Sequence, residues 1–159
     1  MAEQLASRAR GLTFEEFHVG DEAQSVGRTV TETDIVQFSY LTGDWTQLHS
    51  DVEFAAKTPF QARIAHGLLG LSIASGLVAR LGVIEGTALA FRGVDSWKFS
   101  RPIFIGDTVH VTTKVTETKA MPRLGGGLVT MEVAVVNQKG EVCQRGVWEV
   151  LIRSGATTP

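Results

Sequence analysis

The residues with the clearest potential for chemistry are Asp44 and His49, which lie five positions apart in the segment 43–49 (GDWTQLH). A carboxylate and a neutral imidazole can share one water molecule and act on it as general acid and base. Seventeen residues after His49, the pair His66-Gly67 opens a long apolar segment. If that segment is a helix, its first backbone N–H groups are free to stabilise a developing oxyanion. The pattern therefore predicts addition of water to, or its removal from, a carbonyl-activated substrate.

Each of these side chains also has a structural interpretation. Asp44 can serve as a turn residue, and His49 can be a hydrogen-bonded structural histidine. His66 is expected to orient the loop or cap the helix rather than to act directly in catalysis. The sequence has four dispersed histidines and one cysteine without ligand spacing, so we expect no metal ion.

A helix is expected just before the GDWTQLH segment. Thr31 and Asp34 have the form of a capping box, which predicts a helix over residues 34–41. Gly43 ends this helix, because glycine readily adopts the left-handed conformation found at helix C-termini. The segment that follows is expected to be irregular.

Two more helices are expected after this segment. A short one over residues 51–56 begins at a cap formed by Ser50 or Asp51. The longest covers residues 65–81 and is apolar nearly all round, so we expect other elements to surround it on most sides.

From residue 88 onward the periodicity is that of strands, with apolar and polar residues alternating over 109–116. Four strands are expected, the last two as an antiparallel hairpin, over residues 88–99, 109–116, 128–137 and 142–152. Residues 122–127 are expected to form a glycine-rich loop. Helices followed by a run of strands predict an α+β fold, with an antiparallel sheet curved around the long helix.

The composition is that of one globular domain, with 159 residues of which 43% are hydrophobic and 20% charged. The formal net charge of −2 gives no reason to expect nucleic acid or an anionic membrane as a partner. The single cysteine, Cys143, excludes an intrachain disulfide. No secretory signal and no bilayer-spanning apolar run are recognisable, which favours a cytoplasmic protein. We expect flexible residues 1–12, a folded domain over 13–153 and a flexible tail over 154–159.

With these motifs the chain resembles the MaoC-like dehydratases, or R-specific enoyl-CoA hydratases, over residues 12–153. The residues that carry the resemblance are Gly43-Asp44, Leu48-His49, Phe54-Ala55, Ile64-Ala65-His66-Gly67, Phe99-x-x-Pro102 and Gly106-Asp107. Their order and spacing are those of the family signature. The resemblance implies a single hotdog domain, an α+β fold in which a curved antiparallel sheet wraps around a long central apolar helix.

The chain departs from the family pattern between its aspartate and its histidine. The family has Asn-Pro there, and this sequence has Thr46-Gln47. In hydratases that asparagine helps to order the catalytic loop, and Thr46 retains a hydroxyl group but lacks the two amide donors. The difference allows for a substrate other than a simple straight-chain enoyl thioester.

The resemblance implies reversible syn addition of water to a 2-enoyl-CoA, which gives a (3R)-3-hydroxyacyl-CoA. Asp44 and His49 would hold and activate the water, and the backbone N–H of Gly67 would stabilise the thioester oxygen. No cofactor is implied beyond the CoA of the substrate.

Candidates for substrate binding are Trp45, Thr46, His66, Ser75, Lys98 and Arg101. Ser75 matches a serine that some family members place near the catalytic residues, although it could instead be a small residue that faces the sheet. Trp45 could line the acyl pocket or only pack the loop. Lys98 and Arg101 could contact the phosphates of CoA, but surface cations are common.

Two other functions are open on the same fold. An acyl-CoA thioesterase usually places its carboxylate on the central helix. Residues 66–79 contain no Asp or Glu, which counts against a thioesterase. A non-catalytic acyl-thioester-binding protein is left open by Thr46-Gln47. The carrier could be CoA or an acyl-carrier protein, and the family's edge-to-edge pairing of sheets implies a homodimer or an assembly of dimers.

Overall fold

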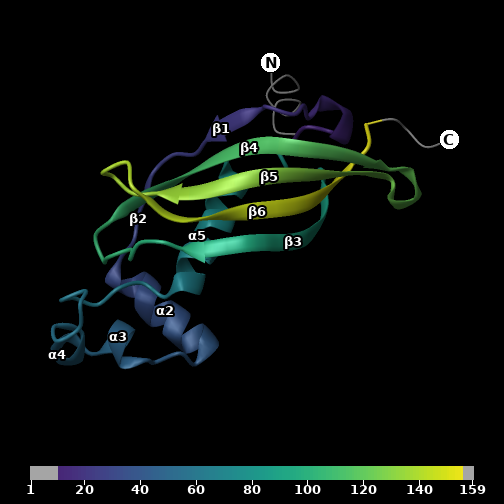
Figure 1. The fold of residues 1–159 in the computed structure, drawn as a ribbon. Coiled ribbons are helices and arrows are strands. Elements are labelled where there is room, and N and C mark those ends of the chain that lie inside the picture. Colours follow the sequence, from purple (N-terminus) through teal and green to yellow (C-terminus); the bar gives the residue numbers. More distant parts are fainter. Residues whose placement is uncertain (1–10, 156–159) are drawn as a thin grey trace, which may run out of the picture.

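Six strands form a curved antiparallel sheet in the computed structural model, which describes residues 11–155 (Figure 1). Five of them are hydrogen-bonded in the order β1-β4-β5-β6-β3, and β2 pairs with β4. Their bounds are Glu22–Gln24 (β1), Arg28–Thr29 (β2), Ala88–Phe99 (β3), Thr108–Met121 (β4), Gly126–Val136 (β5) and Val142–Arg153 (β6). The four long strands and the antiparallel hairpin of β5 and β6 are confirmed, and β4 continues to Met121, past its predicted end.

The segment 122–127 differs from the expected loop. A turn of 3-10 helix, η2 (Pro122–Leu124), precedes Gly125, and the next two glycines already belong to β5. A side chain at Gly127 would begin 2.2 Å from the ring of Phe14. Glycine at this position therefore admits the ring of an N-terminal residue rather than making a flexible turn.

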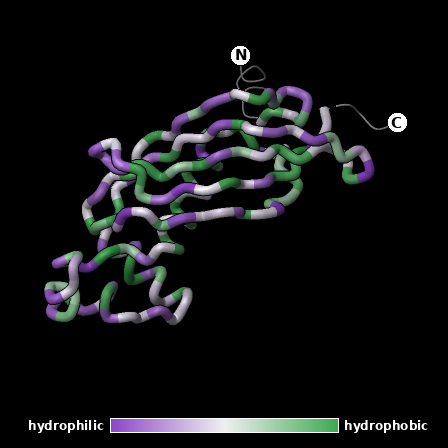
Figure 2. Tube along the Cα trace, in the orientation of Figure 1, coloured by the Kyte–Doolittle hydropathy of each residue, from purple (hydrophilic) through white to green (hydrophobic). Residues whose placement is uncertain are grey.

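The helix α5 (Gly67–Arg80) packs with one face against the sheet (Figure 1). Apolar and polar residues alternate along much of the strands (Figure 2), so one face of the sheet can meet the helix. The residues of α5 that are buried are Leu69, Gly70, Ile73, Ala74, Leu77 and Val78. Leu68, in contrast, is 59% exposed. The expectation that α5 is covered on most sides is therefore wrong for the single chain, since one sheet can cover only one side of a helix.

Three shorter helices lie together at one end of the sheet (Figure 1), and they carry the GDWTQLH segment. They are α2 (Glu32–Thr42), α3 (Gln47–Ser50) and α4 (Val52–Ala55). The predicted capping box is present, with the side chains of Thr31 and Asp34 bonded to each other's backbone N–H groups. Asp51 caps α4, since its carboxylate accepts the N–H of Phe54 at 2.9 Å. The helix α3 was not predicted, so His49 lies on a helical turn rather than in an irregular segment.

The chain ends are partly held by backbone bonds. Gly11 and Leu12 donate their N–H groups to the carbonyls of Glu85 (2.7 Å) and Val83 (2.8 Å). The other residues expected to be flexible at the ends, 1–10 and 156–159, lie outside the described residues. Within residues 11–155, no helix has the length and apolar character needed to cross a membrane.

Candidate active site

Asp44 lies in the turn after α2, where Gly43 ends the helix with a φ of 77° and donates its N–H to the carbonyl of Ser39 (2.8 Å). This left-handed conformation suits glycine and lets the chain turn toward α3. The Oδ1 atom of Asp44 accepts hydrogen bonds from the hydroxyl group (2.6 Å) and the backbone N–H (3.1 Å) of Thr46. These bonds, the hydroxyl bond above all, lower the pKa of the Asp44 carboxyl, so Asp44 is ionised at neutral pH.

His49 is oriented by a backbone carbonyl from another part of the chain. Its Nδ1 lies 2.8 Å from the carbonyl oxygen of Ile64. Ile64 itself forms an isolated antiparallel β-bridge with Phe104. Because a carbonyl can only accept, Nδ1 carries the hydrogen of the neutral ring, and Nε2 keeps a free lone pair. The fold therefore determines which nitrogen of His49 is open to a ligand.

His66 connects the Asp44 turn with α2 and His49. Its side chain is buried, and Nε2 lies 3.0 Å from the backbone carbonyl of Asp44 and 3.3 Å from the hydroxyl of Ser39. Its ring stacks on that of His49, with centroids 3.9 Å apart and planes inclined by 33°. Burial lowers the pKa of His66, so the ring stays neutral at neutral pH. These contacts hold the Asp44 turn against the start of α5.

A pocket of about 280 Å³ lies beside His49, and its lining includes Gly67, Phe99, Arg101 and Gln144. Gly67 is the first residue of α5, so its N–H belongs to the free donors of a helix N-terminus. A Cβ at this position would lie 2.9 Å from the ring of Phe99, so glycine is needed where the helix meets that ring. Arg101 is largely exposed and lies 3.4 Å from Glu141.

Trp45 and Ser75, both predicted to bind substrate, do not line this pocket. Trp45 is 45% exposed and packs edge-on against the ring of Tyr40, with centroids 4.9 Å apart. Ser75 lies on the exposed side of α5, and its hydroxyl donates to the carbonyl of Ser72 (2.8 Å). Trp45 therefore packs the loop against α2, and Ser75 makes only a local helix contact within the described residues.

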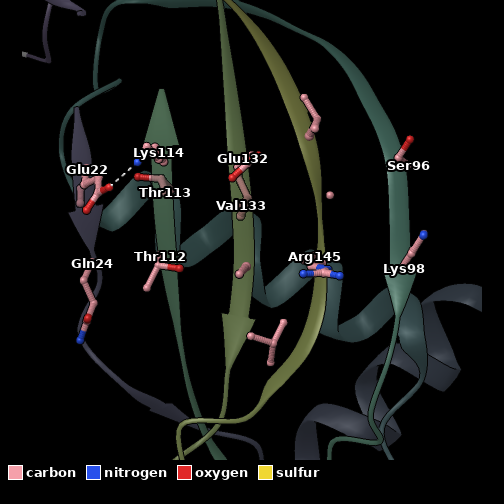
Figure 3. A pocket seen from close by; sticks show the side chains of 15 residues that line it. Glu22, Gln24, Ser96, Lys98, Thr112, Thr113, Lys114, Glu132, Val133 and Arg145 are labelled. Atoms are coloured by element: carbon pink, nitrogen blue, oxygen red, sulfur yellow. Dashed lines mark ion pairs between the residues drawn. The ribbon is translucent and has the colours of Figure 1, made fainter. Parts of the chain in front are cut away.

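Lys98 lies on the outer face of the sheet. It lines a hollow of about 760 Å³ there, directly across the strands from Arg145 (Figure 3). Phe99, the next residue, lines the pocket beside His49 on the other face, because successive side chains of a strand alternate. The structure therefore separates Lys98 from His49 and Gly67, whereas Arg101 lines the same pocket as these two residues.

Asp44, His49 and His66 also form a cluster of metal-ligand type. One side-chain oxygen or nitrogen of each lies within 4.8 Å of the others. The sequence indicated dispersed histidines without ligand spacing, and the fold corrects that premise by stacking two of them. One ring nitrogen of each histidine already bonds to a backbone carbonyl, Nδ1 of His49 to Ile64 and Nε2 of His66 to Asp44, which leaves one nitrogen of each for a metal. A site that works without a metal remains our expectation.

Three groups that hold this site were not predicted from the sequence: the hydroxyl of Ser39, the carbonyl of Ile64 and the amide of Gln144. Their partners lie 27, 15 and 77 residues away along the chain, so no local spacing indicates them. Ser39 could have been found as a polar residue one turn after Ile35 on the buried face of a helix. A backbone carbonyl such as that of Ile64 leaves no signal in the sequence.

Residues 16–138 match the family described as MaoC like domain. The chain is 36% identical over 112 residues to a 3-hydroxybutyryl-CoA dehydratase from Methylorubrum extorquens, with 68% of this chain and 66% of that protein covered. It is 39% identical over 98 residues to Protein MaoC from Klebsiella aerogenes, with 62% of this chain and 29% of that protein covered. The chain thus spans only part of the length of these two relatives.

Solved structures are similar over almost the whole chain. A monoamine oxidase regulatory protein from Archaeoglobus fulgidus is 40% identical, with a TM-score of 0.85 and coverage of 94% of this chain and 97% of that one. An unliganded R-hydratase from Pseudomonas aeruginosa is 29% identical, with a TM-score of 0.76 and 94% of each chain covered. A double-hotdog protein from Mycobacterium tuberculosis, at 20% identity and a TM-score of 0.78, shows that the fold is the hotdog fold.

Proposed function

We propose, because the chain belongs to the family of MaoC-like domains, that it catalyses the reversible hydration of a 2-enoyl-CoA to a (3R)-3-hydroxyacyl-CoA. One observation carries the proposal. The ionised carboxylate of Asp44 and a ring nitrogen of His49 lie within 4.8 Å of each other, beside the pocket that contains the start of α5. A single water at ordinary hydrogen-bond distance from both groups can bridge that gap.

Asp44 and His49 can each accept a hydrogen bond from one of the two hydrogens of that water. Asp44 offers an ionised oxygen, and His49 offers its unprotonated Nε2. As the water oxygen bonds to C3 of the enoyl group, one of its protons passes to this acid–base pair, and the pair returns a proton to C2. The C2–C3 double bond is consumed, and both side chains end in their starting protonation states. General acid–base help of this kind contributes about 10² to 10⁴ in rate.

The thioester oxygen gains negative charge as C3 is attacked. The backbone N–H of Gly67, at the N-terminus of α5, is the donor we assign to it. Arg101, on the lip of the same pocket, is the cation we assign to a phosphate of the carrier, which is CoA or the phosphopantetheine of an acyl-carrier protein.

The direct test follows the loss of enoyl-thioester absorbance with crotonyl-CoA and with longer, branched and dicarboxylic enoyl-CoAs. Hydration of any of them, with a (3R) product, supports the proposal and identifies the acyl class. Release of free thiol without loss of the double bond would instead make the protein a thioesterase. Binding of the acyl-CoAs without either reaction would make it a non-catalytic acyl-thioester-binding protein.

The ionisation of Asp44 is expected to depend on Thr46. The Thr46 hydroxyl is the main cause of the lowered pKa of the Asp44 carboxyl. The carboxyl should therefore stay ionised above that lowered pKa and gain its proton as the pH falls through it. Thr46→Val raises the pKa of Asp44, so the carbon-13 NMR signal of this carboxyl should titrate at a higher pH than in wild type. At the pH where the wild-type carboxyl is half ionised, that of the variant should be less than half ionised.

Thr46→Ser is the matched control for this titration, because serine retains the hydroxyl that donates to Asp44. The pKa of Asp44 in Thr46→Ser should stay near that of wild type. A Thr46→Val titration that coincides with both would show that the Thr46 hydroxyl does not lower the pKa of Asp44.

Metal removal is expected to leave the activity unchanged. The proposed steps use only a carboxylate, an imidazole and a backbone N–H, and both histidines already donate a ring N–H to a carbonyl. Dialysis against EDTA should therefore keep kcat/KM within about twofold of the untreated protein, since no step of general acid–base catalysis here needs an ion. A loss that Zn²⁺ or Mn²⁺ restores would contradict a metal-free site.

A reducing, cytoplasmic setting is also part of the proposal. Cys143 is a free thiol, and it is buried in the core. Burial raises the pKa of this thiol and so keeps it unreactive. A free cysteine of this kind is compatible with the cytoplasm.

The free edge of β3 supports a homodimer. This strand pairs with β6 on one side, and no described strand pairs with its other edge. Its exposed apolar side chains are Leu89, Phe91, Val94 and Phe99, each 37–53% exposed. An unpaired edge with apolar side chains is a template for pairing with a second chain.

The expected mass in solution is therefore about twice that of the 17.2 kDa chain, or a higher even multiple. Leu89→Lys places a charge on this edge, and it should shift the weight-average mass in sedimentation toward the monomer at low concentration. Leu124→Lys, an exposed leucine in η2, is the control and should sediment as wild type does. A wild type that remains a monomer up to about 100 μM would refute the dimer, because a stable C2 assembly should form well below that concentration.

A further inference from the structure

Gln144 is a buried amide beneath the first turn of α5. It lies on β6, is 3% exposed, and lines the pocket beside His49. Its Nε2 donates to the carbonyl oxygen of Gly67 at 3.1 Å, and its Oε1 accepts from the indole N–H of Trp97 at 3.2 Å. Because an indole N–H can only donate and a carbonyl can only accept, these partners determine the orientation of the amide.

Gly70 provides the room that this amide occupies. A Cβ on Gly70 would lie 2.2 Å from Nε2 and 2.9 Å from Cδ of Gln144. Glycine inside a helix is less favourable than alanine. Here it lets a strand side chain reach the Gly67 carbonyl, which lies one turn earlier in the helix. The hydrogen bond from Gln144 to Gly67 therefore depends on the absence of a side chain at Gly70.

This contact holds the helix start from the side of the sheet. The N–H assigned to the thioester oxygen belongs to the peptide that joins His66 and Gly67. The carbonyl held by Gln144 belongs to the next peptide, and the His66 ring before it is bonded to the carbonyl of Asp44. Anchors in β6 and in the Asp44 turn therefore flank this N–H on both sides.

We propose that Gln144 is a positioning residue that keeps the N–H of Gly67 aimed at the thioester oxygen. The inference rests on the proposed hydratase function. An oxyanion donor is effective when it is held in place before the charge develops. Because the charge on the oxygen is larger in the transition state than in the bound substrate, Gln144 should act on kcat more than on KM.

Two variants disturb the contact from opposite sides. Gln144→Leu removes both amide hydrogen bonds at similar side-chain size, and Gly70→Ala displaces the amide while it favours the helix. Each should lower kcat about tenfold to 10²-fold, with KM within about twofold of wild type. Gly76→Ala is the matched control, since it is also an α5 glycine and its Cβ would meet nothing within 4 Å.

A spectroscopic measurement separates positioning from a merely structural role. The probe is 4-dimethylaminocinnamoyl-CoA, an aryl-enoyl thioester whose absorption moves to the red when a donor polarises its carbonyl. Wild type and Gly76→Ala should produce the full red shift on binding, and Gln144→Leu and Gly70→Ala a reduced one. Thermal midpoints of all four proteins report the stability of the fold.

The outcomes are distinguishable. If wild type hydrates enoyl-CoA but the two contact variants keep its kcat and red shift, Gln144 has no positioning role and the hydratase function stands. A lower thermal midpoint with unchanged kcat and red shift also overturns the inference. If wild type hydrates none of the enoyl-CoAs, the proposed function fails and the inference fails with it. Should Gln144→Leu not fold, Gly70→Ala decides the question.

Discussion

Asp44→Asn is expected to lower kcat by about 10² to 10⁴, the range that general acid–base catalysis contributes. The amide of asparagine keeps an oxygen that can accept both bonds from Thr46, so the turn after α2 should retain its shape. What is lost is the negative charge and the ability to take a proton. The substitution therefore removes the chemistry of Asp44 with little change in its geometry.

Hydration of the best enoyl-CoA in the panel measures this effect, with substrate affinity followed separately. KM should change little, because the carboxylate acts on the water and not on the thioester carrier. Asp51→Asn is the matched control, since it makes the same chemical change two residues after His49. Asparagine caps a helix about as well as aspartate, so α4 should persist and the activity should stay near that of wild type.

A loss of kcat in Asp51→Asn as large as that in Asp44→Asn would indicate that any negative charge near α3 and α4 supports the reaction. Asp44 would then not be a specific base. Full activity in Asp44→Asn would be inconsistent with the water-bridging arrangement, and would leave His49 as the single proton-transfer group.

His49→Asn is the second substitution with a large expected effect, again about 10² to 10⁴ in kcat. The asparagine amide nitrogen corresponds in position to Nδ1, so it can still donate to the carbonyl of Ile64. No atom replaces Nε2. The variant therefore keeps the anchor of this side chain and removes only the acceptor that faces the water.

His49→Gln makes the complementary comparison, because its amide reaches the position of Nε2 but gives up the bond to Ile64. The glutamine oxygen can accept a hydrogen bond from water but cannot take its proton at neutral pH. Both variants should therefore be impaired if proton transfer matters. Recovery in His49→Gln alone would indicate that His49 only orients the water.

His18→Asn serves as the control for these two variants. His18 is an exposed histidine in the segment before β1. The His18→Asn protein should therefore hydrate enoyl-CoA as fast as wild type. Thermal midpoints close to that of wild type in His49→Asn would assign the loss to chemistry rather than to folding. The double variant Asp44→Asn/His49→Asn should lower kcat by much less than the product of the two single reductions, since the two residues act on one water.

Local signals in the sequence predicted the elements that carry the site. The capping box at Thr31 and the stop at Gly43 each depend on residues within one helical turn, and both appear in the structure. The strand over residues 88–99 likewise follows from its own periodicity and has the predicted bounds. Such signals can be recognised in the sequence because a helix cap bonds residues within one turn, and the alternation of a strand repeats every two residues.

The sequence motifs also identified the residues that converge, since Asp44, His49 and Gly67 lie around one pocket and its neighbouring turn. Their spacing could not give their orientations. The tautomer of His49 is determined by a carbonyl 15 residues away, and the lowered pKa of His66 by burial under other elements. Both depend on which segments pack together.

The tertiary structure alone decided the side of the sheet on which a residue lies. Lys98 and Phe99 are neighbours in the chain, yet pleating sends them to opposite faces, and only the position of α5 determines which face belongs to the site. The contact of Gln144 with Gly67 spans 77 residues and needs the gap left by Gly70. The sequence by itself thus determined the fold class, the helix start and the catalytic candidates, because these follow from local rules and recurrent motifs. The supporting contacts were decided by the packing of a strand against a helix, which no short stretch of sequence contains.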